Sequence, residues 1–344
     1  MGRIYDRVRP GGDRGMPLVR TGIGPGRNVT ATATSKPTPR RRMRLGHRGG
    51  LAGYLFVLPS LIFLIIFVIL PILGALYYSL TDYDLMRPPR FAGLKNYGNL
   101  LDDPRFAHSI TNTLLFAGGT VPSGVVTSLL LAALINRSIR GIYTYRALFY
   151  MPVVSSFVSV SLIWLWFYEP QFGLFNDMLE LVGLPRSKFL RGATTSMASI
   201  IVLSVWKNMG LNMVIYMAGL QGIPPHLYEA SEIDGAGRVS QFFRITMPLL
   251  APTTFFVVIV YFIGALQMFV QVWIMSTGSG YETGVREAVG GPLDSTLTVV
   301  VLLYANAFEW LKMGYASSMS FVLVAIIGIV TILNARLLRY DIGY

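Results

Sequence analysis

Six apolar segments alternate with more polar stretches from residue 54 to the C-terminal region. Each has roughly 20 or more residues, enough for a helix to cross the hydrocarbon core of a bilayer. The predicted spans are Tyr54–Leu80, Thr113–Ile135, Leu148–Tyr168, Met197–Leu220, Leu250–Met275 and Ser317–Leu338. The pattern therefore predicts an all-α integral membrane protein with six transmembrane helices.

One more apolar stretch, "TLTVVVLLYANAF", lies between the fifth and sixth predicted spans and is followed by Glu309. At 13 residues it is too short to cross a bilayer. We interpret it as a buried outer helix or a re-entrant segment.

The polar N-terminal stretch divides the chain into two parts. Residues 1–50 are rich in Gly, Pro, Arg, Ser and Thr and contain no apolar run, which is typical of a disordered tail. Residues 51–344 then form the membrane domain. No apolar core of a signal peptide occurs in the first 30 residues. The basic patch "RRRMRLGHR" ends the tail and predicts a cytoplasmic N-terminus by the positive-inside rule, with binding to anionic lipid as the alternative. Six spans then place both termini in the cytoplasm.

Composition supports a membrane protein and argues against several other classes. Hydrophobic residues make up 53% of the chain and charged residues 13%. There is no cysteine, and the three histidines are too scattered for a metal cluster, so we expect no metal site. The net charge of +12 does not indicate nucleic-acid binding, because the tail and the gaps between spans carry nearly all of the basic residues.

A polar stretch before the fifth span predicts a helical hairpin at about 224–248. Pro224 and Pro225 suit the first turn of a helix, and Gly235 suits its end. A second short helix follows, with Val239, Phe242, Phe243 and Thr246 on one face. Helices of about ten residues reach only ~15 Å, half a bilayer. The hairpin is therefore expected at the cytoplasmic surface, where periodicity alone identifies no partner and a plain cap of the helix bundle remains an alternative.

The spacing within this hairpin resembles the EAA signature of bacterial ABC importer permeases. Glu229-Ala230-Ser231, Asp234-Gly235-Ala236 and Ile245-Thr246-Met247-Pro248 carry the match, which departs at Ser231 and Met247. The segments "PILGALYYSLTDYD", "FAGLKNYGNLL", "YMPVVSS" and "YASSMS" resemble carbohydrate permeases of the maltose type. Residues 278–291, "GSGYETGVREAVGG", depart from that family, which leaves their contacts with a binding protein open.

The resemblance implies a type I ABC importer permease in a bacterial cell membrane. Its partners would be a second permease subunit in a heterodimer, two ATPase subunits that use ATP and Mg, and an extracytoplasmic solute-binding protein. The hairpin would be the coupling helix that docks on an ATPase subunit, with Glu229 paired to a basic residue and Gly235 making the turn. The implied coupling residues are Leu227, Glu229, Ala230, Ile233, Asp234, Gly235 and Ala236.

The chain lacks a nucleotide-binding loop of its own. None of its lysines follows a glycine, so no G-x-x-x-x-G-K-[ST] motif exists. No catalytic grouping is evident either. We therefore expect a non-catalytic subunit without a cofactor, and a separate ATPase.

Polar residues inside the spans are candidates for a substrate path, because they are costly in a membrane. They are Lys207, Asn208, Asn212, Gln267 and Gln271. Lys207 has the alternative of snorkelling or internal pairing. Positions that match sugar-contacting residues of the maltose permease are Asn208, Leu211, Tyr261, Gly264, Ala265 and Met268. The last four are spaced to share one helical face. The side chains of Leu211, Ala265 and Met268 are poor hydrogen-bonding partners for a sugar. Either the cavity therefore lets solutes pass with little selectivity of its own, or the partner permease holds the solute-binding site.

The solute class implied by the resemblance is a sugar or a related polyol or glycerol phosphate. An ion-coupled secondary transporter would need paired acidic residues within spans and an inverted repeat, and no Asp or Glu lies at a span centre. A non-transport membrane scaffold is the other alternative.

Overall fold

The computed structural model describes residues 49–136, 141–278 and 289–337. Contacts divide the chain into a unit up to Pro59 and a unit from Ser60 onward. The predicted tail, residues 1–50, lies outside the described residues except for Gly49 and Gly50, which are helical.

The first predicted span is one helical run. Helix α1 (Gly49–Leu64) continues through a π-helical turn, Ile65–Ile69, into α2 (Leu70–Ser79). Its large apolar side chains between Leu61 and Leu73 are exposed. An exposed apolar surface of this length is expected for a helix in contact with lipid or with another subunit.

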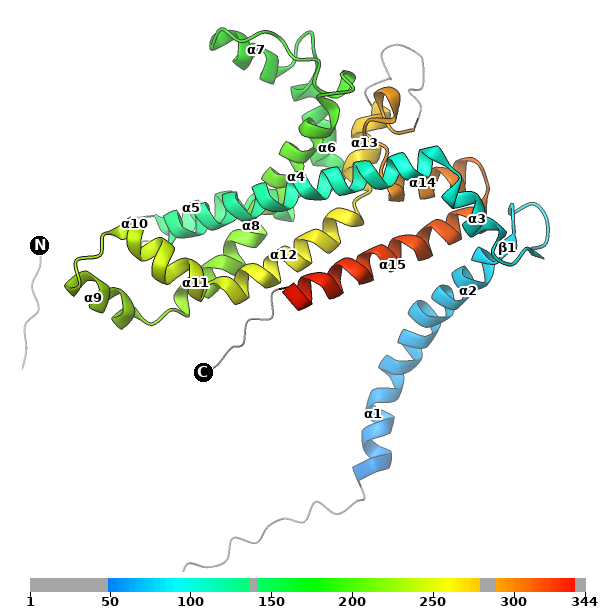
Figure 1. The fold of residues 1–344 in the computed structure, drawn as a ribbon, viewed down its shortest axis with the longest axis horizontal. Coiled ribbons are helices and arrows are strands. Elements are labelled where there is room, and N and C mark those ends of the chain that lie inside the picture. Colours follow the sequence, from blue (N-terminus) through cyan, green and yellow to red (C-terminus); the bar gives the residue numbers. More distant parts are fainter. Residues whose placement is uncertain (1–48, 137–140, 279–288, 338–344) are drawn as a thin grey trace, which may run out of the picture. The chain divides into compact units, whose positions relative to one another are not determined.

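Long helices form the core of the second unit. Helix α4 (Pro104–Ile135) packs along α8 (Ser196–Gln221), and α12 (Ala251–Leu266) lies against α4 (Figure 1). Helix α15 (Met313–Leu337) packs on α2 and extends the predicted sixth span at its N-terminal end. Helix α4 begins nine residues before the predicted second span, because the Asp103 carboxylate caps it by accepting hydrogen bonds from the Arg105 and Phe106 N–H groups.

The predicted third span, Leu148–Tyr168, is wrong as a single helix. Helix α5 (Ile142–Val154) ends before α6 (Phe157–Phe167), and the two are bent by 97°. Ser155 and Ser156 between them adopt extended backbone angles. Pro152 lies in the last turn of α5, where its missing N–H weakens the helix and favours a break.

The predicted fifth span, Leu250–Met275, is also discontinuous. Helix α12 ends at Leu266, and α13 (Val270–Gly278) begins after a three-residue break. The break lets Phe269 and Trp273 pack around Tyr304, with ring centroids 4.8 Å from Tyr304 in both cases. Tertiary packing thus overrides a sequence that is apolar enough for one helix.

The short apolar stretch is confirmed as a buried helix. It forms α14 (Val299–Tyr304) and a π-helical turn, Ala305–Glu309, with most of its side chains buried. Within the described residues, four helices are long and apolar enough to cross a membrane, and two bent helix pairs raise that number to six. The all-α, six-span fold class is therefore confirmed.

The remaining elements are short. Strands β1 (Thr81–Asp82) and β2 (Arg90–Phe91) pair antiparallel, with Thr81 opposite Phe91, and lead into α3 (Lys95–Leu101). Helix α7 (Leu174–Leu181) and two 3₁₀ turns, Phe189–Arg191 and Pro292–Asp294, complete the described chain outside the hairpin.

Candidate functional site

The first helix of the predicted hairpin is confirmed. Helix α9 (Pro225–Ile233) begins with a proline in its first turn and ends before Gly235, whose φ is +79°. The Gly235 N–H donates to the Glu232 carbonyl and the Ala236 N–H to the Ser231 carbonyl, at 3.0 and 2.9 Å. These two bonds are those of a Schellman motif, which needs a left-handed residue that glycine supplies without strain.

The second helix is less regular than predicted. It starts as α10 (Arg238–Gln241), passes through a π-helical turn, Phe242–Thr246, and ends as α11 (Met247–Leu249). A bend of 65° then separates it from α12. Pro248, which has no backbone N–H to donate, lies in α11 directly before this bend.

Side-chain hydrogen bonds hold the two helices of the hairpin together. The Tyr228 hydroxyl lies 2.9 Å from the Thr246 hydroxyl, and the Gln241 amide donates to the Ser231 hydroxyl at 2.9 Å. Ser231 is one of the two departures from the signature that the hairpin resembles. Its hydroxyl joins α9 to α10 in a way that an alanine cannot, so the departure has a structural reason.

The hairpin presents a mixed acidic and apolar surface. Glu229, Ala230, Glu232 and Asp234 are exposed, and Ile233 retains 87% of its accessible area. On the second helix, Val239 and Phe243 are 73% and 61% exposed. Leu227, an implied coupling residue, does not share this exposed surface, because it packs inward against a buried cluster with Tyr228 and Phe242. Leu227 therefore packs the hairpin onto the helix bundle, whereas Ala230 and Ile233 face outward.

The structure brings only some of the candidate substrate-path residues together. Tyr261 on α12 lies near Asn208 on α8, but its hydroxyl makes no hydrogen bond within the described residues. Asn212, Ala265 and Gln271 are buried, whereas Leu211, Gly264 and Gln267 are exposed.

The prediction that Tyr261, Gly264, Ala265 and Met268 share one helical face is wrong. Helix α12 ends at Leu266, so Met268 lies in the break before α13 and is buried in the core. The aromatic packing described above, which Phe269 joins directly after Met268, accounts for this break.

Lys207 is held inside the protein. Its side chain is 3% exposed, and its ammonium donates to the Pro152 and Val153 carbonyls at 2.6 and 3.1 Å. Both carbonyls belong to the last turn of α5 and lose their helical partners at the break. The ammonium also lies 4.6 Å from the ring centroid of Phe157, the first residue of α6. Of the alternatives left open by the sequence, internal pairing is therefore the one observed.

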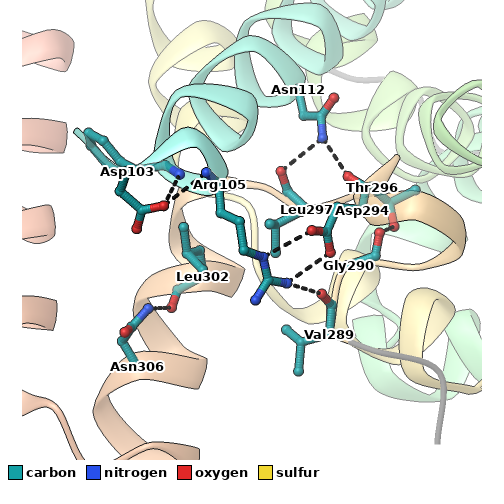
Figure 2. Close-up of polar contacts among 11 residues, drawn as sticks. Asp103, Arg105, Asn112, Val289, Gly290, Asp294, Thr296, Leu297, Leu302 and Asn306 are labelled. Carbon is teal, nitrogen blue, oxygen red and sulfur yellow. Dashed lines mark hydrogen bonds and ion pairs between the residues drawn. The ribbon is translucent and has the colours of Figure 1, made fainter. Parts of the chain in front are cut away.

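A polar network lies at the N-terminal end of α4 (Figure 2), whereas the hairpin packs near the C-terminal end of that helix. The Arg105 guanidinium donates to both carboxylate oxygens of Asp294, at 3.0 and 2.9 Å. The Asn112 amide donates to the Asp294 and Leu297 carbonyls at 2.8 and 3.1 Å. Asp294 has a φ of +56°, so these bonds hold a strained turn in place. The network fixes the segment that leads into α14.

A cavity of about 570 Å³ opens beside this network. Its walls come from β1 and the residues after it, α3, the start of α4, the π-helical turn 305–309 and the start of α15. Sequence reasoning missed it, since it joins residues from Asp82 to Tyr315. The capping aspartate before Pro104 and Arg105 was the one local signal.

Comparisons with known proteins place the chain among transport proteins. Residues 124–339 match the family described as binding-protein-dependent transport system inner membrane component. The sulfoquinovosyl glycerol transport system permease protein SmoG of Agrobacterium fabrum is 32% identical over 308 residues, covering 88% of this chain and 96% of that protein. The sn-glycerol-3-phosphate transport system permease protein UgpA of Yersinia pestis is 30% identical over 292 residues, covering 85% and 95%.

A chain of the crystal structure of a bacterial alginate ABC transporter has the same fold. That structure contains a periplasmic protein bound to alginate pentasaccharide. Its chain superposes with a TM-score of 0.70 at 23% identity, covering 85% of this chain and 95% of that chain.

Proposed function

This chain belongs to the family of inner membrane components of binding-protein-dependent transport systems and is a multi-pass membrane permease; from this premise we propose how it works. With a second, different permease subunit it forms the translocation path of an ATP-driven importer. The solute is a sugar or a related polyol or glycerol phosphate. Relatives named for sulfoquinovosyl glycerol and glycerol-3-phosphate transport support that class.

The hairpin carries the proposal. Its exposed face combines carboxylates with the apolar side chains of Ala230, Ile233, Val239 and Phe243, and such a surface suits burial against another protein. In this proposal Glu229 pairs with a basic residue of an ATPase subunit. Ile233, Ala230 and Asp234 contact that subunit directly, while Leu227, Gly235 and Ala236 fix the shape of the hairpin.

ATP hydrolysis belongs to two partner subunits in this proposal, because the chain has no nucleotide-binding loop. The chain itself is non-catalytic and binds no cofactor. A hairpin whose helices are joined by two side-chain hydrogen bonds can move as a rigid unit, so closure of the ATPase pair can switch the spans between inward-open and outward-open states.

The hairpin faces the cytoplasm in this arrangement, together with both termini. The cavity beside Arg105 then lies at the outer face, where an extracytoplasmic binding protein delivers the solute. Asn208, Asn212, Tyr261 and Gln271 are the best placed residues for the path between the two faces, because they are polar and lie inward on α8, α12 and α13.

Reconstitution tests the proposal. The chain is expressed with its partner permease, ATPase and binding protein, and ATP-driven solute uptake is measured in proteoliposomes. We expect the ATPase to co-purify, and we expect Glu229→Lys to abolish uptake, since it places a positive charge against a basic partner. Glu232→Lys, an exposed charge on the same helix outside the signature, is the matched control and should retain most uptake. Undiminished uptake by Glu229→Lys, or uptake driven by an ion gradient without ATP, would contradict the proposal.

A further inference from the structure

The cavity beside Arg105 has the size of a small-molecule site. Its volume of about 570 Å³ falls within the ~300–1,000 Å³ of typical ligand pockets. Aromatic and amide side chains line it together with charged ones, including Tyr83, Asn99, Asn306, Trp310 and Lys312. Neither the hairpin nor the candidate path uses any of these residues.

The charges in the cavity wall are largely satisfied within the protein. Arg105 is bound by both oxygens of Asp294. The Asp103 carboxylate accepts hydrogen bonds from the start of α4 and from the Tyr315 hydroxyl, the latter at 2.7 Å. Lys95 and Asp82 lie 4.0 Å apart. Lys312 also lines the cavity and makes no ion pair among the described residues. A wall in which most charges have partners offers little to a strongly charged ligand and suits a neutral one that exchanges hydrogen bonds.

Asn306 supplies a hydrogen-bond acceptor at this cavity. Its side chain is only 3% exposed, and its Nδ2 donates to the Leu302 carbonyl at 2.9 Å (Figure 2). No donor to its Oδ1 is found among the described residues, and the residue lines the cavity. An amide oxygen that has no protein donor and belongs to a cavity-lining residue can accept a hydrogen bond from a ligand hydroxyl or N–H group.

Trp310 supplies an apolar surface at the same cavity. It is 40% exposed, and the Arg105 guanidinium lies 5.5 Å from its ring centroid, which fixes the orientation of the indole. An oriented aromatic ring beside amide groups recognises a molecule with apolar C–H faces and many hydroxyl groups.

We propose that this cavity is a binding site for a neutral carbohydrate or polyol at the outer face of the permease, with Asn306 and Trp310 as ligand-contacting residues. The inference rests on the proposed function, which supplies the orientation and the solute class. The site holds the solute near the outer ends of α4 and α15 after it leaves the binding protein. It is separate from the candidate path through α8 and α12.

The complete transporter in lipid nanodiscs, without the binding protein, allows ligand contact to be measured directly. Saturation-transfer difference NMR is recorded with glucose, maltose and glycerol as probes, and with sn-glycerol 3-phosphate as the charged comparison. The variants are Asn306→Ala, Trp310→Ala and the milder Trp310→Phe. Asn334→Ala is a matched control, because Asn334 makes the same bond to the carbonyl four residues earlier, at 3.0 Å. Trp166→Ala, at an exposed tryptophan of α6, controls for loss of an indole.

We expect signals from at least one neutral probe, weaker by about three- to tenfold in Asn306→Ala and Trp310→Ala, the effect of losing one hydrogen bond or ring contact. Trp310→Phe keeps an aromatic ring and should lose less, and both controls should match the wild type. No signal from any neutral probe would overturn the inference. Equal signals in the cavity variants would do the same and would locate the ligand elsewhere.

Two further outcomes separate this inference from the proposed function. If the cavity variants keep the probe signals and instead bind the solute-binding protein less tightly, the cavity receives a protein and not a sugar, and the inference is wrong. If wild-type uptake is ATP-driven but probe binding is unchanged in the Asn306 and Trp310 variants, only the inference fails. Failure of the ATPase to co-purify would instead count against the proposed function.

Discussion

Replacing Lys207 with methionine should damage the bend between α5 and α6. The change keeps the length of the side chain but removes its ammonium. The Pro152 and Val153 carbonyls then lose donors at 2.6 and 3.1 Å, and Phe157 loses a cation 4.6 Å from its ring. Ser155 and Ser156 do not continue the helix, so no backbone N–H replaces these donors.

The magnitude follows from these contacts. A hydrogen bond to a charged group contributes ~1.5–3 kcal/mol and a desolvated cation–π contact up to ~2 kcal/mol. The variant no longer buries a charge, which offsets a large part of the loss. We therefore expect a net loss of about 2–3 kcal/mol for the bent conformation. Each ~1.4 kcal/mol lost by the bent conformation lowers the ratio of bent to unbent protein tenfold. We therefore expect uptake to fall by at least about tenfold.

The assay compares uptake in proteoliposomes with assembly, measured as ATPase that co-purifies. Lys207→Met should reduce uptake while retaining part of the assembly, and Lys207→Arg, which keeps a donor cation, should recover part of the uptake. Lys188→Met, at an exposed lysine outside the spans, is the control. Wild-type uptake by Lys207→Met would refute the reasoning that this ammonium supports the bend.

Three further predictions concern the glycines and one acidic contact. Gly235→Pro should leave assembly partly intact but uncouple ATP hydrolysis from uptake, since proline cannot adopt a φ of +79°; Gly237→Ala, with open space and negative φ, should not. Gly124→Ala should lower the free energy of unfolding by the ~1–3 kcal/mol typical of overpacking, and with it the thermal unfolding midpoint, because its Cβ would lie 2.1 Å from the Tyr261 ring. Gly118→Ala, with nothing within 4 Å, is its control. The hydrogen bond from Arg186 lowers the pKa of Glu180, so the stability it gives α7 should be present above pH 4.5 and be lost as the pH falls through the lowered value. Amide hydrogen exchange in α7, corrected for its intrinsic pH dependence, should then quicken as the pH falls below 4.5, and unchanged protection would contradict this.

The hairpin was predictable because its signals are local. Proline at the start of α9 and Gly235 after its end determine the boundaries from within a dozen residues. The apolar lengths of the long helices are likewise local, so α4, α8 and α15 could be placed to within a few residues at most ends. The roles of the hairpin residues remain predictions.

The broken spans were not predictable, because their compensating contacts come from elsewhere in the chain. Lys207 satisfies carbonyls 54 and 55 residues away, and the break after α12 depends on Tyr304. Nothing in the apolar runs themselves marks these breaks strongly. The cavity beside Arg105 is harder still to predict, because Arg105 and Asp294 are 189 residues apart and meet only in the folded protein.

Site-directed cross-linking at the hairpin tests the central claim most directly. The chain has no cysteine, so Ile233→Cys, at a position that is 87% exposed, introduces its one thiol. Leu101→Cys on α3, at the opposite end of the helix bundle and 88% exposed, is the control (Figure 1). In the reconstituted complex, a thiol-reactive cross-linker should join position 233 to the ATPase subunit and leave position 101 unjoined to it. An ATPase that cross-links to position 101, or to neither position while uptake remains ATP-driven, would contradict the account.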